Sequence, residues 1–196
     1  PSASAEVAGY VRDRLEGGEP MSWRELFQVA DTAFGGTQAE GKYTPKDAYD
    51  AAEAGMNAYI LAHPELYSPN GTDPAKAALA IQALERRTQM LPTQTKRTEE
   101  QDEFQQFSTV PAFAYVANWV ANPSGLDLML EPSAGIGGLA VFARAAGAKL
   151  VLNELSSRRA AVLQEVFPGT QVFSENAEQI NNVLPDDVRP SIVVTN

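Results

Sequence analysis

Residues 126–140 read LDLMLEPSAGIGGLA: a short apolar run, a glycine-rich turn and the start of a helix. We expect a strand over 126–130 and a helix over 138–146. The alternation then continues, with strands expected at 149–153, 171–174 and 192–195 and helices at 156–167 and 177–182. Such alternation favours parallel strands joined by crossover helices. The sequence therefore predicts an α/β fold with a doubly wound, Rossmann-like sheet, and ligands outside the carboxyl ends of its strands.

The sequence before residue 107 predicts an α-helical module instead. Cap residues mark the helix starts: Ser22 with Glu25 three residues later, Thr44 before Pro45, and Asp73 before Pro74. We expect helices over 5–15, 22–34, 44–63 and 73–90, and another over 111–121. The apolar face expected for the third helix consists of Ala48, Ala52, Met56, Tyr59 and Ile60. We therefore divide the chain into an α-helical module, residues 1–106, and an α/β domain, residues 107–196.

The composition excludes several classes of site. The 196 residues include no cysteine and one histidine, His63. Disulfides, a cysteine nucleophile and a metal site built on cysteine are therefore excluded, and a Ser-His-Asp triad would need His63 as its base. No apolar run reaches the roughly 18 residues of a membrane span, and the N-terminus lacks the pattern of a secretory signal. We expect no membrane partner and a cytoplasmic location.

The charge balance argues against a large basic surface. Fifteen Lys and Arg stand against 25 Asp and Glu, for a net charge of −10. Nucleic acid would then bind weakly or through a local patch, since its phosphates attract clustered Lys and Arg. The candidate patch is Arg86, Arg87, Lys96 and Arg97, although a solvated helix end is the favoured interpretation.

The glycine-rich turn is compatible with two ligands. Residues 135–140 match the G-x-G-x-x-A fingerprint of dinucleotide sites. Glu154 lies about 20 residues further on. Both NAD sites and S-adenosylmethionine sites use an acidic residue at this position to hold the ribose. Glu131, at the tip of the first strand, favours a ligand that carries an ammonium and a sulfonium, because it would repel a pyrophosphate. An NAD-dependent oxidoreductase remains the less favoured alternative.

Five segments resemble, in order, the motifs of DNA methyltransferases that act on the N6 amino group of adenine. They are Phe107-Ser108-Thr109, residues 131–137 (EPSAGIG), Asn153-Glu154, Glu175-Asn176-Ala177 and Val193-Val194-Thr195-Asn196. The order looks like the gamma arrangement of these enzymes. The closest resemblance is to the methyltransferase-like region of large bacterial, plasmid and phage proteins that carry strawberry-notch-type helicases.

The resemblance implies an S-adenosylmethionine cofactor and a role for each matching position. Phe107, Thr109 and their neighbours would contact the methionine end, Glu131 and the 135–137 turn would flank it, Glu154 would hold the ribose, and Asn176 and Ala177 would lie beside the adenine ring. Asn196 would be the catalytic asparagine. The full set implied for the cofactor is Phe107, Thr109, Glu131, Pro132, Ser133, Ala134, Gly135, Gly137, Glu154, Asn176 and Ala177. Implied partners are DNA, through regions outside this chain, and a fused or associated helicase.

The sequence departs from this family at two places. The catalytic element of the family is Asn-Pro-Pro followed by Phe or Tyr, and only Asn196 matches it. Because the chemistry of the family needs all four residues, we do not expect this chain to methylate by itself. Its start at Pro1 and its end in the β-branched run 191–196 lead us to expect a fragment. Val110 stands where the family often has Pro directly after Thr109. An alternative is a catalytically inactive methyltransferase-like scaffold in a multidomain DNA-processing protein.

The remaining candidates have structural interpretations. His63, before Pro64, is expected to interact with the last carbonyls of a helix. Aromatic residues are expected to pack in the core rather than stack on bases, and Glu175 is either a ligand contact or a solvated loop residue. Ser108 has no base near it in sequence and is discounted as a nucleophile. The aromatic residues are Trp23, Phe27, Phe113, Tyr115 and Trp119.

Overall fold

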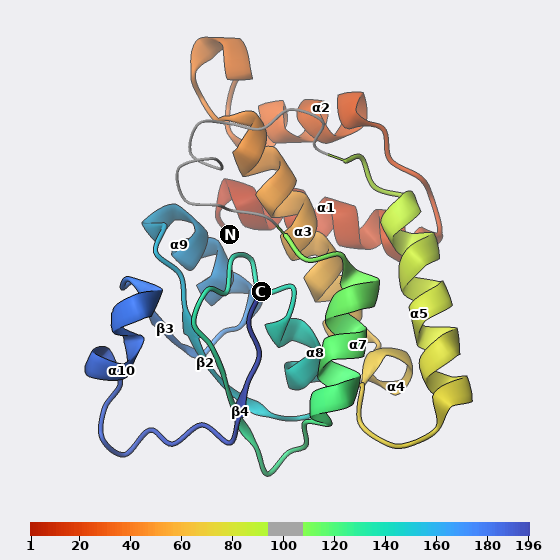
Figure 1. The fold of residues 1–196 in the computed structure, drawn as a ribbon. Helices are drawn as coiled ribbons and strands as arrows, with labels where there is room; N and C mark the ends of the chain where they lie inside the picture. The colour runs from red at the N-terminus through yellow and green to blue at the C-terminus, as the bar shows by residue number, and fades with distance from the viewer. Residues whose placement is uncertain (94–107) are drawn as a thin grey trace.

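The second half of the chain forms a four-stranded, all-parallel sheet (Figure 1). This computed structural model describes residues 1–93 and 108–196. Within them the strands lie in the order β3-β2-β1-β4. Their bounds are β1 Leu128–Glu131, β2 Lys149–Asn153, β3 Gln171–Phe173 and β4 Ile192–Val193. The α/β class with parallel strands, predicted from the strand–helix alternation, is confirmed.

Helices connect the strands as predicted. α8 (Ala140–Ala145) joins β1 to β2, α9 (Ser157–Val166) joins β2 to β3, and the short η2 (Ala177–Gln179) and α10 (Ile180–Val183) precede β4. β1 begins two residues later than we expected, because the carboxylate of Asp127 accepts hydrogen bonds from Ser124 N and from the Ser191 hydroxyl. Leu126 consequently lies outside the strand and is 98% exposed.

The first 93 residues are helical, with short connections. The helices are α1 (Ala3–Gly17), α2 (Trp23–Ala33), η1 (Gln38–Glu40), α3 (Pro45–Ala62), α4 (Pro64–Tyr67) and α5 (Pro74–Gln89). Ser22, Thr44 and Asp73 are the N-caps that the sequence predicts, each accepting a backbone hydrogen bond. We did not predict η1 and α4, which are each a single turn. No helix in residues 1–93 and 108–196 has the length and apolarity needed to span a membrane.

α3 packs against α1 on one side and against α8 and α9 on the other (Figure 1). The apolar face predicted for α3 is buried throughout. One hydrophobic cluster contains Leu26, Ile60 and Leu84 from the helical half together with Met129, Phe142 and Leu163 from the α/β half. The two halves of the chain therefore share a core, and α3 can present side chains to the α/β half.

α7 (Pro111–Ala121) precedes β1 and packs against α5 and α8. Tyr115 is buried and Trp119 is partly buried against the core, as expected. The same expectation is wrong for Phe113, which is 71% exposed because α7 turns Ala114, Tyr115 and Asn118 inward. It is also wrong for Trp23, 57% exposed at the first position of α2.

The basic segment is only partly described. Arg87 donates a hydrogen bond from Nε to the hydroxyl of Tyr59 and lies over its ring, so it links α5 to α3. Lys96 and Arg97 lie outside the described residues.

Candidate functional site

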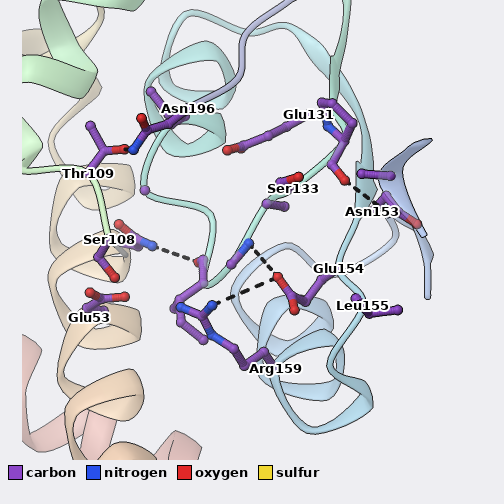
Figure 2. A pocket seen from close by; sticks show the side chains of 18 of the residues that line it. Glu53, Ser108, Thr109, Glu131, Ser133, Asn153, Glu154, Leu155, Arg159 and Asn196 are labelled. Carbon is purple, nitrogen blue, oxygen red and sulfur yellow. Dashed lines mark hydrogen bonds and ion pairs between the residues drawn. The ribbon is translucent and has the colours of Figure 1, made fainter. Parts of the chain in front are cut away.

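A cavity of about 460 Å³ lies at the carboxyl ends of β1, β2 and β4 (Figure 2). The chain runs outward from β1 through β2 to β3, then returns to place β4 on the other side of β1. Parallel sheets bind ligands where the strand order reverses in this way. The volume lies within the range of ordinary small-molecule sites. The sheet therefore places the cavity where the sequence predicts a ligand.

Most of the residues predicted for a ligand line this one cavity. They come from the segment before α7, the turn after β1, the ends of β2 and β4, and the turn after β3. They are Thr109, Glu131, Pro132, Ser133, Ala134, Gly135, Glu154, Asn176, Ala177 and Asn196. Phe107 lies outside the described residues.

Gly137 is not among the lining residues, and its neighbour Gly138 is. Gly137 has a φ of +90°, and a Cβ added there would lie 2.3 Å from the ring of Phe167. This glycine lets the turn pack closely against α9, and the expectation that it flanks a ligand stays a prediction. Its role is to fix the back of the turn.

Glu131 is a buried carboxyl group at the end of β1. Its side chain is 2% exposed, and its Oε2 accepts one hydrogen bond, 3.1 Å long, from the backbone N of Ala140. Burial raises the pKa of Glu131 well above its ordinary value, against the lowering effect of the Ala140 hydrogen bond, and the nearby charge of Glu154 raises it further. A positively charged ligand group in the cavity would stabilise the ionised form.

Glu154, at the end of β2, is held by the backbone around it. Oε2 accepts a hydrogen bond from Gly135 N and Oε1 accepts one from Ser156 N, both 2.8 Å long. A carboxylate oxygen has two lone pairs, so each can accept a second hydrogen bond from a ligand hydroxyl. Glu154 thus fixes the glycine-rich turn and faces the cavity at the same time (Figure 2).

Asn153 fixes two walls of the cavity. Its Nδ2 donates to the carbonyls of Pro132, at 2.9 Å, and Glu175, at 2.8 Å, while its Oδ1 accepts from Glu175 N. The side chain is 1% exposed, so all three hydrogen bonds lie away from solvent. Glu175 is exposed and lines the cavity beside Asn176.

Asn196 and Thr109 meet at one edge of the cavity (Figure 2). Asn196 Nδ2 donates a 2.9 Å hydrogen bond to Thr109 Oγ1, and this bond joins the end of β4 to the segment that precedes α7. Because the amide nitrogen is engaged with Thr109, the amide oxygen remains as an acceptor.

α3 also contributes to the cavity, which the sequence did not predict. Glu53, Met56 and Asn57 line the cavity, and Asn57 Nδ2 donates a 2.9 Å hydrogen bond to the carbonyl of Ile136 in the glycine-rich turn. Burial and the charge of Asp50 raise the pKa of Glu53, while Ser108, Arg159 and Lys46 act against this rise. Glu53 and Asn57 lie on the helix face that also contains Lys46 and Asp50, and no local pattern marks the two as cavity residues.

Arg159 was also missed, and it is the cationic residue of the cavity wall among the described residues. It is 4% exposed and lies between two carboxylates, with Nη1 4.0 Å from Glu154 Oε2 and Nε 3.5 Å from Asp50 Oδ2. Asp50 also pairs with Lys46 at 3.2 Å. Arg159 therefore links α3 to the glycine-rich turn.

His63 lies apart from the cavity. Its ring contacts the carboxylates of Glu16 at 2.9 Å and Glu65 at 3.2 Å. We expected the ring to interact with the last carbonyls of the helix, and this prediction of its partners is wrong. Burial lowers the pKa of His63, but the hydrogen bonds to the two carboxylates outweigh it and leave the pKa raised. Among residues 1–93 and 108–196, no cluster of three or more His, Asp or Glu could hold a metal ion.

Comparison of the chain with protein-family models, curated proteins and solved structures found no match.

Proposed function

We propose that the cavity binds S-adenosylmethionine and that the chain is the cofactor-binding part of a DNA adenine-N6 methyltransferase. The observation that carries the cofactor proposal is the meeting of Glu131, Glu154 and the glycine-rich turn around one cavity. The strand order β3-β2-β1-β4 also agrees with the first four strands of a Rossmann-like sheet.

Charge favours this cofactor over a dinucleotide. The described cavity wall contains Glu53, Glu131, Glu154, Glu175 and Glu178, against Arg159 as its cation. A pyrophosphate would bring two negative charges among these carboxylates, whereas an ammonium and a sulfonium bring positive charge. Glu131 in particular is a buried carboxyl group that accepts one hydrogen bond. A cation beside it would lower the free-energy cost of ionising it.

The other cavity residues would contact different parts of the cofactor. Glu154 would accept hydrogen bonds from the ribose hydroxyls, and Asn176 and Ala177 would lie against the adenine. Glu131 and Ser133 would flank the region of the sulfur. When bound, the cofactor supplies a methyl group made electrophilic by the sulfonium.

Asn196 would act on the acceptor base. Its amide oxygen would accept a hydrogen bond from the adenine amino group and orient the nitrogen lone pair toward the methyl carbon. Thr109 would keep that oxygen on the correct side by holding the amide nitrogen. The DNA substrate is proposed from the motif resemblance, with DNA contacts and any helicase outside these residues.

Calorimetric titration tests the cofactor. We expect S-adenosylmethionine and S-adenosylhomocysteine to bind and NAD not to bind. Glu154→Ala should weaken binding by about 1.5 to 3 kcal/mol, because hydrogen bonds to a charged acceptor are lost. Glu85→Ala, an exposed position on α5, is the control and should leave affinity unchanged. Binding of NAD in place of S-adenosylmethionine would contradict the proposal.

The methyl-transfer step needs its own assay. Any longer protein that carries this chain should transfer labelled methyl groups to the adenine amino group in DNA, and Asn196→Ala should abolish transfer while leaving cofactor binding in place. Cofactor binding without any transfer would instead support the inactive scaffold.

A further inference from the structure

Glu53 lies in the cavity wall contributed by the helical half of the chain. Figure 2 shows Glu53 and Ser108 on one side of the cavity and Glu154 and Leu155 on the other. All four residues line the same space. A ligand that reaches from Glu154 across the glycine-rich turn therefore arrives at a wall formed by α3 and by the segment before α7.

The other residues of that wall are neutral. Asn57 uses its amide nitrogen on the carbonyl of Ile136, and Thr109 accepts the hydrogen bond from Asn196. Ser108 and Met56 carry no charge. Glu53 is consequently the charged group that this side of the cavity presents to a ligand.

Glu53 forms a hydrogen bond with the side chain of Ser108, and among the described residues no ion pair neutralises it. Its side chain is half-buried on α3, one turn before Asn57. Arg159, the cationic residue of the cavity wall, is shared between Asp50 and Glu154. Lys46 is paired with Asp50. A ligand ammonium would supply the positive charge that Glu53 lacks, and its three N–H donors suit the carboxylate and the Ser108 hydroxyl together.

We propose that Glu53 binds the α-ammonium group of the amino-acid tail of the cofactor, so that the helical half of the chain forms one end of the binding site. This inference rests on the proposed function, which sets the sugar of the ligand at Glu154. It makes α3 part of the site as well as part of the core.

Two ligands that differ only in the tail test this inference. S-Adenosylhomocysteine carries the amino-acid tail, whereas 5′-methylthioadenosine keeps the nucleoside and the thioether without it. In Glu53→Gln, we expect affinity for S-adenosylhomocysteine to fall about 10- to 100-fold, since a charged hydrogen-bond partner is lost. Affinity for 5′-methylthioadenosine should stay within about twofold of the wild type.

The controls separate this role from a structural one. Glu85→Gln should affect neither ligand, and thermal unfolding of each variant reports whether the fold is intact. Glu53→Asp, which keeps the charge on a shorter side chain, should bind S-adenosylhomocysteine more tightly than Glu53→Gln does. An equal loss for both ligands, or no loss for either, overturns the inference while leaving the proposed function standing. A wild type that binds neither ligand overturns both.

Discussion

At the scale of single residues, the buried carboxyl group of Glu131 lowers the stability of the fold in the same ionised state that the proposed site needs. Because the pKa of Glu131 is raised in the folded chain, the native state keeps a proton that the unfolded chain loses above its ordinary pKa of 4.5. The free energy of unfolding therefore falls as pH rises from about that value through the raised pKa. At neutral pH an ionised Glu131 costs stability unless a cation lies beside it.

Glu131→Gln should expose this cost. The amide oxygen can still accept the hydrogen bond from Ala140 N, and no charge is buried. We expect the variant to be more stable than the wild type by about 1 to 3 kcal/mol at neutral pH, with the difference shrinking toward pH 4. Denaturant unfolding across this pH range measures it. The same variant should bind S-adenosylmethionine more weakly, and a stability difference that did not change with pH would refute the argument.

Gly137 makes a second residue-scale prediction. Gly137→Ala places a Cβ at a φ of +90° and within 2.3 Å of the Phe167 ring. We expect a loss of about 2 to 4 kcal/mol in the free energy of unfolding, from backbone strain and overpacking together. Gly138→Ala is the matched control, because its added Cβ would meet nothing closer than the carbonyl of Thr109 at 3.8 Å. Equal thermal midpoints for the two variants would contradict this assignment.

At the scale of elements, α3 is the helix that connects the core to the cavity. Its face toward α1 contains Gly55, where an added Cβ would lie 2.7 Å from the carbonyl of Ala8 and from Val11 Cβ. The absence of a side chain at Gly55 sets how closely the two helices approach. The cavity residues Glu53 and Asn57 are two positions away on either side, so the position of α3 also sets the cavity wall.

Gly55→Ala should push α3 away from α1. We expect a loss of about 1 to 3 kcal/mol despite the better helix propensity of alanine, together with weaker ligand binding because Asn57 can no longer hold the carbonyl of Ile136 as before. Gly9→Ala on α1 has no heavy atom within 4 Å and should slightly stabilise the chain. Calorimetry on both variants gives the comparison, and a neutral Gly55→Ala would show that the helices can separate freely.

The helices and strands could be predicted from local chemistry, but the residues at which they begin and end could not always be predicted. Thr44 and Pro45 start α3 where the sequence predicts, because the cap and the fixed φ of proline act within one turn. The predicted start of β1 was wrong by two residues, because the side chain of Asp127 accepts a hydrogen bond from Ser191, which is 64 positions away in the sequence. Long-range partners of this kind leave no local pattern.

At the scale of the whole molecule, the shared core predicts cooperative unfolding. Leu84 and Phe142 belong to one hydrophobic cluster although they lie in different halves of the chain. We expect a single thermal transition, with equal midpoints by far-ultraviolet circular dichroism and by fluorescence of Trp119 in a Trp23→Phe variant. Two separated transitions would show that the halves unfold independently.

The site shows the same division between local and long-range information. The glycine-rich turn, Glu131 and Glu154 could be found from the sequence because strand ends in a parallel sheet fall at one edge. Glu53, Asn57 and Arg159 could not, since their presence depends on how α3 docks against α9. Exposed aromatic side chains such as Phe113 were mistaken for core, because composition alone does not say which face of a helix packs.

The cavity brings together residues as distant as Glu53 and Asn196, with Thr109 hydrogen-bonded to Asn196 across 87 positions. Contacts of such long sequence separation are slow to form, since the chain loses its loop entropy before gaining them. Recovery of binding during refolding should therefore coincide with the slowest kinetic phase, after most helical signal has returned. The ability to bind the ligand should then return when the native topology forms, and not when the secondary structure forms.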